Sequence, residues 1–356
     1  MSTQTHCPYC SLQCGMRLTR RGRETAVETW EEFPTNEGAM CRKGWTSTEL
    51  LGHRERLTTP LLREPATGAF RRATWDEALD LVATRIARIQ GEHGRDAVAV
   101  FGGGGLTNEK AYTLGKFARA VLGTSMVDYN GRWCMSSAAS AGTRAFGLDR
   151  GLPFPIADIE QTDVLVLVGS NLAETMPPAA RHLDRLRERG GKVVVIDPRR
   201  TATADRADVH VQPAPGTDLA LAKGILHSVV AGGWLDQEYV DQRTVGFDAV
   251  RHSIVSWWPE RTERVTGVPA DEVRALARLM GEAERVVVLT ARGAEQHAQG
   301  ADTVLAWVNL ALSLGQCGKP YSGYGCLTGQ GNGQGGREHG QKADQLPGYR
   351  SIEDPA

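Results

Sequence analysis

The chain has 356 residues, of which 41% are hydrophobic, and this length suffices for two or three domains with buried cores. Its 41 basic and 42 acidic residues nearly balance, so no field would attract nucleic acid or an anionic membrane surface. Because no apolar run would span a membrane and the start lacks an apolar secretion segment, we expect a cytoplasmic protein without membrane or nucleic-acid partners.

Four cysteines, Cys7, Cys10, Cys14 and Cys41, stand near the N-terminus. Four soft thiolates suit either a [4Fe-4S] cluster or structural zinc. The spacing favours the cluster, because three cysteines are crowded together and the fourth stands alone, whereas zinc sites usually combine two separate pairs. Disulfides fit poorly, since nothing else in the sequence indicates a small secreted scaffold.

Lys43 follows the fourth cysteine closely, between Arg42 and Gly44. A cation beside a cluster raises the reduction potential of the cluster and would also bridge it to a second, anionic redox cofactor. The alternative is an ordinary solvated lysine. The spacing alone leaves both readings open.

Residues 57–72 are a polar connector without a clear period, and Thr74 then caps a helix with Glu77 in its first turn. We interpret this helix as scaffold, with an apolar stripe formed by Leu79, Val82, Ala83, Ile86 and Ile89. A strand over residues 97–101, a glycine turn over 102–105 and a helix over 108–122 follow. The turn lacks the Lys-Ser or Lys-Thr of a phosphate-binding loop, so it indicates only close approach to some ligand.

Strands are predicted at residues 164–168, 193–196 and 286–289, with helices over 178–189 and throughout 232–281. Alternating strands and helices indicate doubly wound, mostly parallel sheets. Such sheets bind ligands in the loops at the carboxyl ends of their strands. We therefore expect functional residues directly after these strands.

Turn-forming and acidic residues do follow the strands. Gly169, Ser170 and Asn171 come after the first strand and Asp197 after the second. Loops of this kind suit the pyrophosphate and the ribose or base of a nucleotide. An asparagine turn and a strand terminator are the plain alternatives. A third such loop, Pro215–Asp218, favours the nucleotide, although Asp218 would also suit the first turn of a helix.

The tail from Gly315 to Gly348 is rich in glycine, with interspersed Arg337, Glu338 and His339. A flexible linker would explain the glycines alone. Closely spaced backbone with amide and cationic side chains suits a bulky polyanionic cofactor better. Cys317 and Cys326 have no metal-type spacing and are expected to be buried.

The runs His6–Gly15 and Cys41–Gly44, the segment Asn130–Ser137 and the glycine-rich tail resemble the molybdopterin oxidoreductases, the family of nitrate reductases and formate dehydrogenases. The resemblance implies a small N-terminal [4Fe-4S] domain followed by doubly wound α/β domains. The expected divisions are 1–56 for the cluster, 57–150 for an α/β part with the molybdenum-ligand loop, 151–290 for dinucleotide binding, and 291–356 for a return to the pterin-binding α/β domain. The chain ends where the family continues, so we expect an N-terminal portion.

By this resemblance Cys134 is the molybdenum ligand, although a solitary cysteine is otherwise most often inert core. The implied cofactor is molybdenum bis(molybdopterin guanine dinucleotide), and Arg132 and Lys43 are assigned to catalysis. The residues expected to bind the cofactor are Lys43, Asn130, Gly169, Ser170, Asn171, Glu174, Asp197, Arg199, Gly216, Asp218, Arg292, Gly293 and Gln296. His297 is a weaker candidate, since a lone histidine is usually structural.

The segment around Cys134 resembles the nitrate-reducing branch of the family. Met135 stands where formate dehydrogenases tend to carry a proton-accepting histidine, and a thioether cannot accept a proton. We therefore expect a molybdenum-dependent oxidoreductase that reduces nitrate to nitrite by oxygen-atom transfer, supplied with electrons by ferredoxin, flavodoxin or a flavoprotein subunit. The alternatives are formate dehydrogenase or another molybdopterin oxidoreductase, a non-catalytic iron-sulfur subunit, and a zinc-stapled binding protein.

Overall fold

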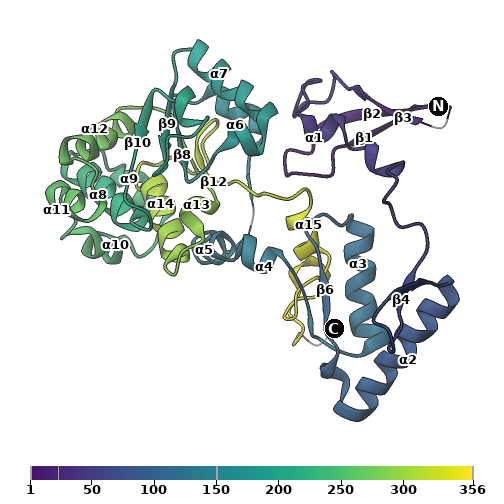
Figure 1. Ribbon diagram of the computed structural model, residues 1–356. Coiled ribbons are helices and arrows are strands. Elements are labelled where there is room, and N and C mark those ends of the chain that lie inside the picture. The colour runs from purple at the N-terminus through teal and green to yellow at the C-terminus, as the bar shows by residue number, and fades with distance from the viewer. Residues whose placement is uncertain (1, 23, 150, 355–356) are drawn as a thin grey trace.

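The computed structural model describes residues 2–22, 24–149 and 151–354. Figure 1 shows three parts: a small antiparallel sheet near the N-terminus, a large α/β unit in teal and green, and a lobe of helices α2 and α3 with strand β6. The yellow C-terminal segment leaves the α/β unit and returns to this lobe. Within the described residues, no helix is both long and apolar enough to cross a membrane.

The α/β unit is built on a five-stranded parallel sheet with the strand order β10-β9-β8-β11-β12. Its strands are β8 (Val164–Val168), β9 (Lys192–Ile196), β10 (Val209–Val211), β11 (Val286–Thr290) and β12 (Gly323–Cys326). The three predicted strands are confirmed, while β10 and the glycine-containing β12 were missed because both are short. The predicted parallel α/β fold is confirmed.

Both faces of this sheet are covered, which explains why β8 and β11 are buried along their whole length. Val166 on one face packs against helices α8 (Asp218–Ala231), α12 (Ala270–Gly281) and α14 (Gly300–Ser313). Leu165 and Leu167 on the other face pack with α7 (Ala180–Glu188) and with Leu12 and Met16 of the N-terminal part. The remaining helices of the unit are α5 (Ser136–Phe146), α6 (Leu172–Thr175), α9 (Gln237–Arg243), α10 (Phe247–Ile254), α11 (Pro259–Thr266) and α13 (Arg292–Glu295).

The strand order changes direction between β8 and β11. From β8 the chain moves to β9 and β10 on one side, and afterwards to β11 and β12 on the other. Such a switch point opens a crevice at the carboxyl ends of the two strands, which is the usual ligand site of a doubly wound sheet.

The N-terminal part is an antiparallel sheet of β1 (Ser2–His6), β2 (Gly15–Arg21) and β3 (Glu24–Thr29), followed by the short helix α1 (Arg42–Trp45). The register pairs His6 with Gly15, so the first three cysteines lie in the loop that joins β1 to β2. This sheet places them at the edge that packs on the α/β unit.

The lobe differs in several details from the sequence expectation. Its predicted strand is β6 (Val100–Gly102), paired in parallel with β7 (Val127–Tyr129), and it begins later because residues 95–97 form a helical turn. The connector holds a hairpin of β4 (Leu61–Arg63) and β5 (Phe70–Arg72). The predicted helix of residues 108–122 is α3 (Asn108–Lys116) continued by a π-helical turn.

Helix α2 (Trp75–His93) begins as predicted, because the Thr74 hydroxyl accepts a hydrogen bond from the backbone N–H of Glu77. None of its residues is buried, and Leu79 and Val82 on the predicted apolar stripe are more than half exposed. The predicted scaffold role of α2 is therefore not supported by burial of its apolar stripe.

The tail after β12 joins the lobe to the α/β unit. The backbone N–H of Asn332 donates to the carbonyl of Gly104, and the Tyr129 hydroxyl donates to that of Gly333, at 2.7 and 2.6 Å. Helix α15 (Gly333–Glu338) then packs against α3. The four domain ranges expected from the sequence stay a prediction.

Candidate cofactor site

The first three cysteines are brought together by the β1–β2 hairpin. Cys7 follows β1 directly and Cys14 precedes β2, and the N–H of Cys7 donates to the carbonyl of Cys14 at 2.8 Å. Cys10 lies in the loop between them, and Cys41 caps the N-terminus of α1. A Cβ on Gly44 would stand 3.8 Å from the Cys7 sulfur, so the fourth cysteine reaches the same place through α1.

The four thiols lie close enough together to interact electrostatically. Burial raises the pKa of Cys7 and, with the thiols of Cys10 and Cys41 nearby, raises the pKa of Cys14 to about 12. Among the described residues no group of three or more His, Cys, Asp or Glu is arranged to hold a single metal ion. Four thiols in mutual reach suit a [4Fe-4S] cluster, in which each thiolate binds a different iron.

Lys43 lies between the cysteines and the α/β unit. Its ammonium group acts electrostatically on the Cys7 thiol and donates to the carbonyl of Thr175, at the end of α6, at 3.5 Å. Lys43 thus lies near a cluster cysteine and near α6, and its predicted role as a bridge between the cluster and a second cofactor stays a prediction.

The loops after β8 and β11 touch at the switch point. Gly169, with a φ of +63°, accepts a hydrogen bond from the N–H of Gly293 at 3.0 Å. A Cβ on Gly169 would clash with the backbone N of Ala294 and stand 2.8 Å from the Cα of Gly293. Only a glycine permits this approach, which brings the backbones of the two loops together at one edge of the sheet.

The predicted nucleotide residues surround this contact. Asn171 donates from its amide to Glu174 and accepts from the hydroxyl of Thr203, at 2.7 and 2.8 Å. The carboxylate of Asp197, after β9, accepts from the N–H of Arg199 at 2.9 Å. Ser170 is also buried in this region.

Gly216 and Asp218 enter from the loop before α8. Burial raises the pKa of the Asp218 carboxyl, and the neighbouring Asp197 acts in the same direction whereas His297 opposes it. The same histidine lies 3.9 Å from the place of a Cβ on Gly216. The three predicted loops thus converge, and two buried carboxyls beside them are able to accept N–H groups of a base.

Cys134 ends the short helix α4 (Gly131–Cys134) beyond β7, and its side chain is half-buried. Asn130 fixes this helix, because its side chain accepts from the N–H of Gly104 at 2.8 Å and donates to Gln330 at 2.6 Å. Met135 turns inward and is buried in the core of the α/β unit. The predicted glycine turn therefore serves to position the Cys134 loop.

Arg132 forms an ion pair with Asp128 and borders a cavity whose lining does not include Cys134. Its guanidinium donates to Asp128 at 2.6 Å and is 47% exposed. It lines a cavity of about 580 Å³ that Arg337 and Lys342 of the tail also border. An assignment of Arg132 to catalysis stays a prediction.

Arg292 is the cation that does approach Cys134. From the first turn of α13 its Nη1 lies 3.9 Å from the Cys134 sulfur and 2.8 Å from the carbonyl of Leu327. Gln296, from the end of the same short helix, donates to the carbonyl of Trp133 at 3.3 Å. Two side chains of the loop after β11, those of Arg292 and Gln296, thus contact the end of helix α4 that carries Cys134.

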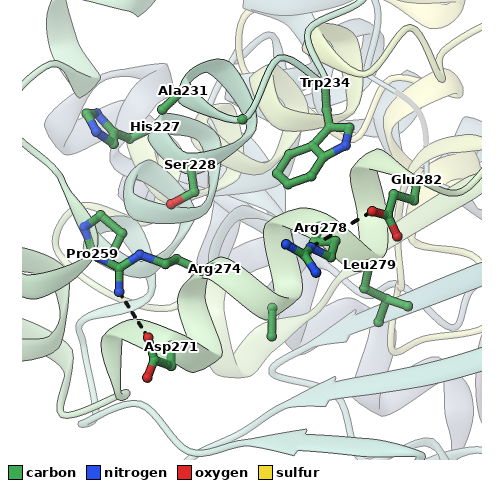
Figure 2. Close-up of a pocket in the computed structure, with 12 residues that line it drawn as sticks. His227, Ser228, Ala231, Trp234, Pro259, Asp271, Arg274, Arg278, Leu279 and Glu282 are labelled. Atoms are coloured by element: carbon green, nitrogen blue, oxygen red, sulfur yellow. Dashed lines mark hydrogen bonds and ion pairs between the residues drawn. The ribbon is translucent and has the colours of Figure 1, made fainter.

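The glycine-rich tail crosses between the cluster loop and Cys134. The N–H of Ser11 donates to the carbonyl of Gly329 at 3.2 Å, and a Cβ on Gly329 would stand 4.0 Å from the Cys134 sulfur. A cavity of about 360 Å³ borders this crossing, lined by Gln13, Met176 and Gln334 among others. A third cavity, of about 650 Å³, is lined by residues of α8, α11 and α12 and by no cysteine (Figure 2).

Sequence reasoning missed Glu295 and Cys326, which contact Arg292 directly. Glu295 lies three residues after Arg292, a spacing that allows an ion pair on one helix turn and was the available signal. No local sequence pattern predicts the contact of Cys326 with Arg292, because only the pairing of β11 with β12 brings the two residues together.

The fold and the site define an α/β protein in which a four-cysteine segment packs on a doubly wound sheet, with glycine loops in contact at the switch point of that sheet. Residues 1–52 match the Fe4S4 domain of the molybdopterin oxidoreductases, and residues 56–356 match the molybdopterin oxidoreductase domain itself. The chain therefore belongs to the molybdopterin oxidoreductase family. A [4Fe-4S] cluster and a molybdopterin cofactor are the groups that correspond to these two domains, and the cysteine and switch-point geometry fits both.

Individual relatives agree with this family. The chain is 43% identical to the assimilatory nitrate reductase catalytic subunit of Bacillus subtilis, over 98% of this chain and 49% of that protein. It is 34% identical to a nitrate reductase of Synechocystis, over 99% and 51%, and 33% identical to formate dehydrogenase H of Escherichia coli, over 99% and 50%. The chain thus spans about half the length of these relatives.

Acetylene hydratase from Pelobacter acetylenicus has a similar fold. The TM-score is 0.78 at 22% identity, over 88% of this chain and 43% of that one. At this identity the likeness supports the fold alone.

Proposed function

We propose that this chain is the part of a molybdenum-dependent nitrate reductase that carries the [4Fe-4S] cluster and the Cys134 loop. The observation that carries this proposal is the 43% identity to the assimilatory nitrate reductase catalytic subunit across nearly the whole chain. Met135 supports it, since no histidine follows Cys134 that could accept a proton from formate.

Four thiolates, from Cys7, Cys10, Cys14 and Cys41, hold the cluster, and Cys134 supplies the protein ligand to molybdenum. The cofactor is molybdenum bis(molybdopterin guanine dinucleotide), which when bound would supply the chemistry by which nitrate, two electrons and two protons become nitrite and water. Backbone N–H groups beside Gly169 and Gly293 bind phosphate oxygens, and the Asp197 and Asp218 carboxyls accept hydrogen bonds from the guanine.

The other predicted residues support this arrangement. Lys43 lies between the cluster thiols and α6. There its positive charge would favour electron transfer from the cluster to the pterin. Asn171 and Glu174 shape the pyrophosphate loop together. Arg132, whose guanidinium pairs with Asp128, would help to orient the substrate or shield the metal.

The donor is a small electron carrier such as ferredoxin, flavodoxin or a flavoprotein subunit, and the setting is nitrate assimilation in the cytoplasm. The donor would reach the cluster at Cys10 and Cys41, the two partly exposed cysteines of the four.

Formate oxidation is the second candidate, because formate dehydrogenases are 33 to 35% identical over almost the whole chain. The two are separated by assaying the protein, produced without oxygen in a host that makes the cofactor, with reduced viologen and nitrate or with oxidised viologen and formate. We expect nitrite formation and no formate-dependent reduction, with Cys134→Ala as the inactive control. Formate-dependent viologen reduction without nitrite formation would replace the nitrate assignment.

A further inference from the structure

We propose that Glu295 is a positioning residue that holds the Arg292 guanidinium against the sulfur of Cys134. This inference rests on the proposed function, in which Cys134 binds the metal. Glu295 contacts the Nε and Nη2 of Arg292, whereas the sulfur is contacted by Nη1, so Glu295 acts through the arginine.

Arg292 has no donor left for a substrate. Its Nε and Nη2 donate to the Glu295 carboxylate, Nη2 also contacts the Cys326 sulfur at 3.3 Å, and Nη1 is shared between the Leu327 carbonyl and the Cys134 sulfur. A guanidinium has five N–H donors, and these five contacts use them all. Arg292 therefore acts on the sulfur and does not bind the nitrate anion.

The Glu295 carboxylate is itself held by further contacts besides Arg292. Its side chain is 1% exposed, and its Oε1 accepts from the hydroxyl of Thr290 at 2.7 Å and lies 3.4 Å from the sulfur of Cys326. The Tyr324 hydroxyl lies 2.7 Å from the same Thr290 oxygen and completes a chain of hydrogen bonds across β11 and β12. A carboxylate this buried needs its cation, and the rigid strands fix where that cation stands.

The sulfur of Cys134 thereby receives a positively charged neighbour in one orientation. Groups that hold a metal ligand in this way tune the metal and orient its bond, even though they do not touch it. Removing the carboxylate leaves the half-buried Arg292 without its counter-charge, so we expect the guanidinium to change its orientation and release the sulfur.

The contact is measurable without any cofactor, by 15N NMR of the arginine side chains in the full chain. If Glu295 holds Arg292 on Cys134, Cys134→Ser shifts the Arg292 guanidinium signals in the wild-type background and leaves them unmoved in the Glu295→Gln background. Arg292→Lys assigns the signals. Glu282→Gln is the matched control, because it removes a carboxylate from an exposed ion pair with Arg278 (Figure 2).

The cofactor-loaded protein gives the second readout. We expect Glu295→Gln to change the Mo(V) electron paramagnetic resonance signal and to lower kcat about 10- to 100-fold with little change in KM for nitrate. Glu282→Gln should leave both as they are. A purely structural role would change thermal stability but not the resonance signal of the protein that remains folded.

The two experiments separate this inference from the proposed function. A wild-type protein that binds molybdenum and a Glu295→Gln protein with an unchanged resonance signal would overturn the inference alone. A wild-type protein without molybdenum would count against the proposed function, and the NMR comparison would then decide the inference. Equal shifts of Arg292 by Cys134→Ser in both backgrounds would disprove it.

Discussion

Gly169 shows how a single residue controls the switch point. Its positive φ and its contact with Gly293 together exclude any side chain. Gly190 is a matched comparison, because its φ is +90° but no atom lies within 4 Å of the place of its Cβ. Both glycines therefore have a positive φ, but only Gly169 lies against a neighbouring backbone.

We expect Gly190→Ala to lower the free energy of unfolding by about 1 kcal/mol through backbone strain alone. Gly169→Ala should cost about 3 kcal/mol, because two loops must also move apart. Denaturant unfolding of both variants measures the difference. Equal losses would mean that the loops after β8 and β11 do not touch.

The site residues could be predicted where one loop carries them. Gly169, Asn171 and Asp197 follow strands whose apolar runs mark them clearly, and the structure brings these loops together as expected. Asn130 was carried over only by resemblance, and its partners Gly104 and Gln330 lie far away in the sequence. Long-range pairs of this kind leave no local pattern to read.

At the scale of elements, the long buried strands were predictable and the short ones were not. Apart from Lys192 at the start of β9 and Thr290 at the end of β11, strands β8, β9 and β11 consist of Val, Leu and Ile, without a helical period. Strand β12 reads Gly-Tyr-Gly-Cys, which suits a turn, and pairing with β11 overrides that preference. Pairing with β11, and not the local sequence, therefore makes residues 323–326 the edge strand of the sheet.

Helix α2 was predictable as a helix but not in its environment. Its apolar stripe predicts packing, yet Leu79 and Val82 are exposed, whereas Leu221 on α8 is fully buried. Leu79→Glu and Val82→Glu should each change the unfolding free energy of this chain by less than about 0.5 kcal/mol.

Leu221→Ala should instead cost about 2–5 kcal/mol, because it opens a cavity between α8 and the sheet. Thermal unfolding of the three variants tests this contrast. A loss of more than about 2 kcal/mol from either glutamate variant would show that the stripe of α2 is packed.

At the scale of the whole molecule, an ion-pair network joins the cluster part to the α/β unit. Glu37, in the segment before Cys41, pairs with Arg181 and Arg185 of α7 at 2.6 and 2.8 Å. The hydrogen bond from Arg185, aided by the charge of Arg181, lowers the pKa of Glu37 to about 2. Glu37 thus links the N-terminal part to helix α7, which covers one face of the sheet.

The pH dependence follows from the sign of that shift. A lowered pKa in the folded state stabilises the protein above pH 4.5, and this contribution is lost as the pH falls toward 2. Because Glu37 is partly exposed, we expect Glu37→Gln to cost only about 0.5–1 kcal/mol at pH 7. Unfolding of both proteins between pH 3 and 7 should show this gap narrowing at acid pH, and a constant gap would refute the network's role.

We expect the chain to carry an iron-sulfur cluster and a molybdenum centre on either side of the crossing at Gly329. The measurement that tests it most directly is the iron, molybdenum and zinc content per chain of protein purified without oxygen from a host that makes the cofactor. We predict about four irons and one molybdenum, with Cys134→Ala keeping the iron and losing the molybdenum. Zinc in place of iron, or molybdenum retained by Cys134→Ala, would contradict the account.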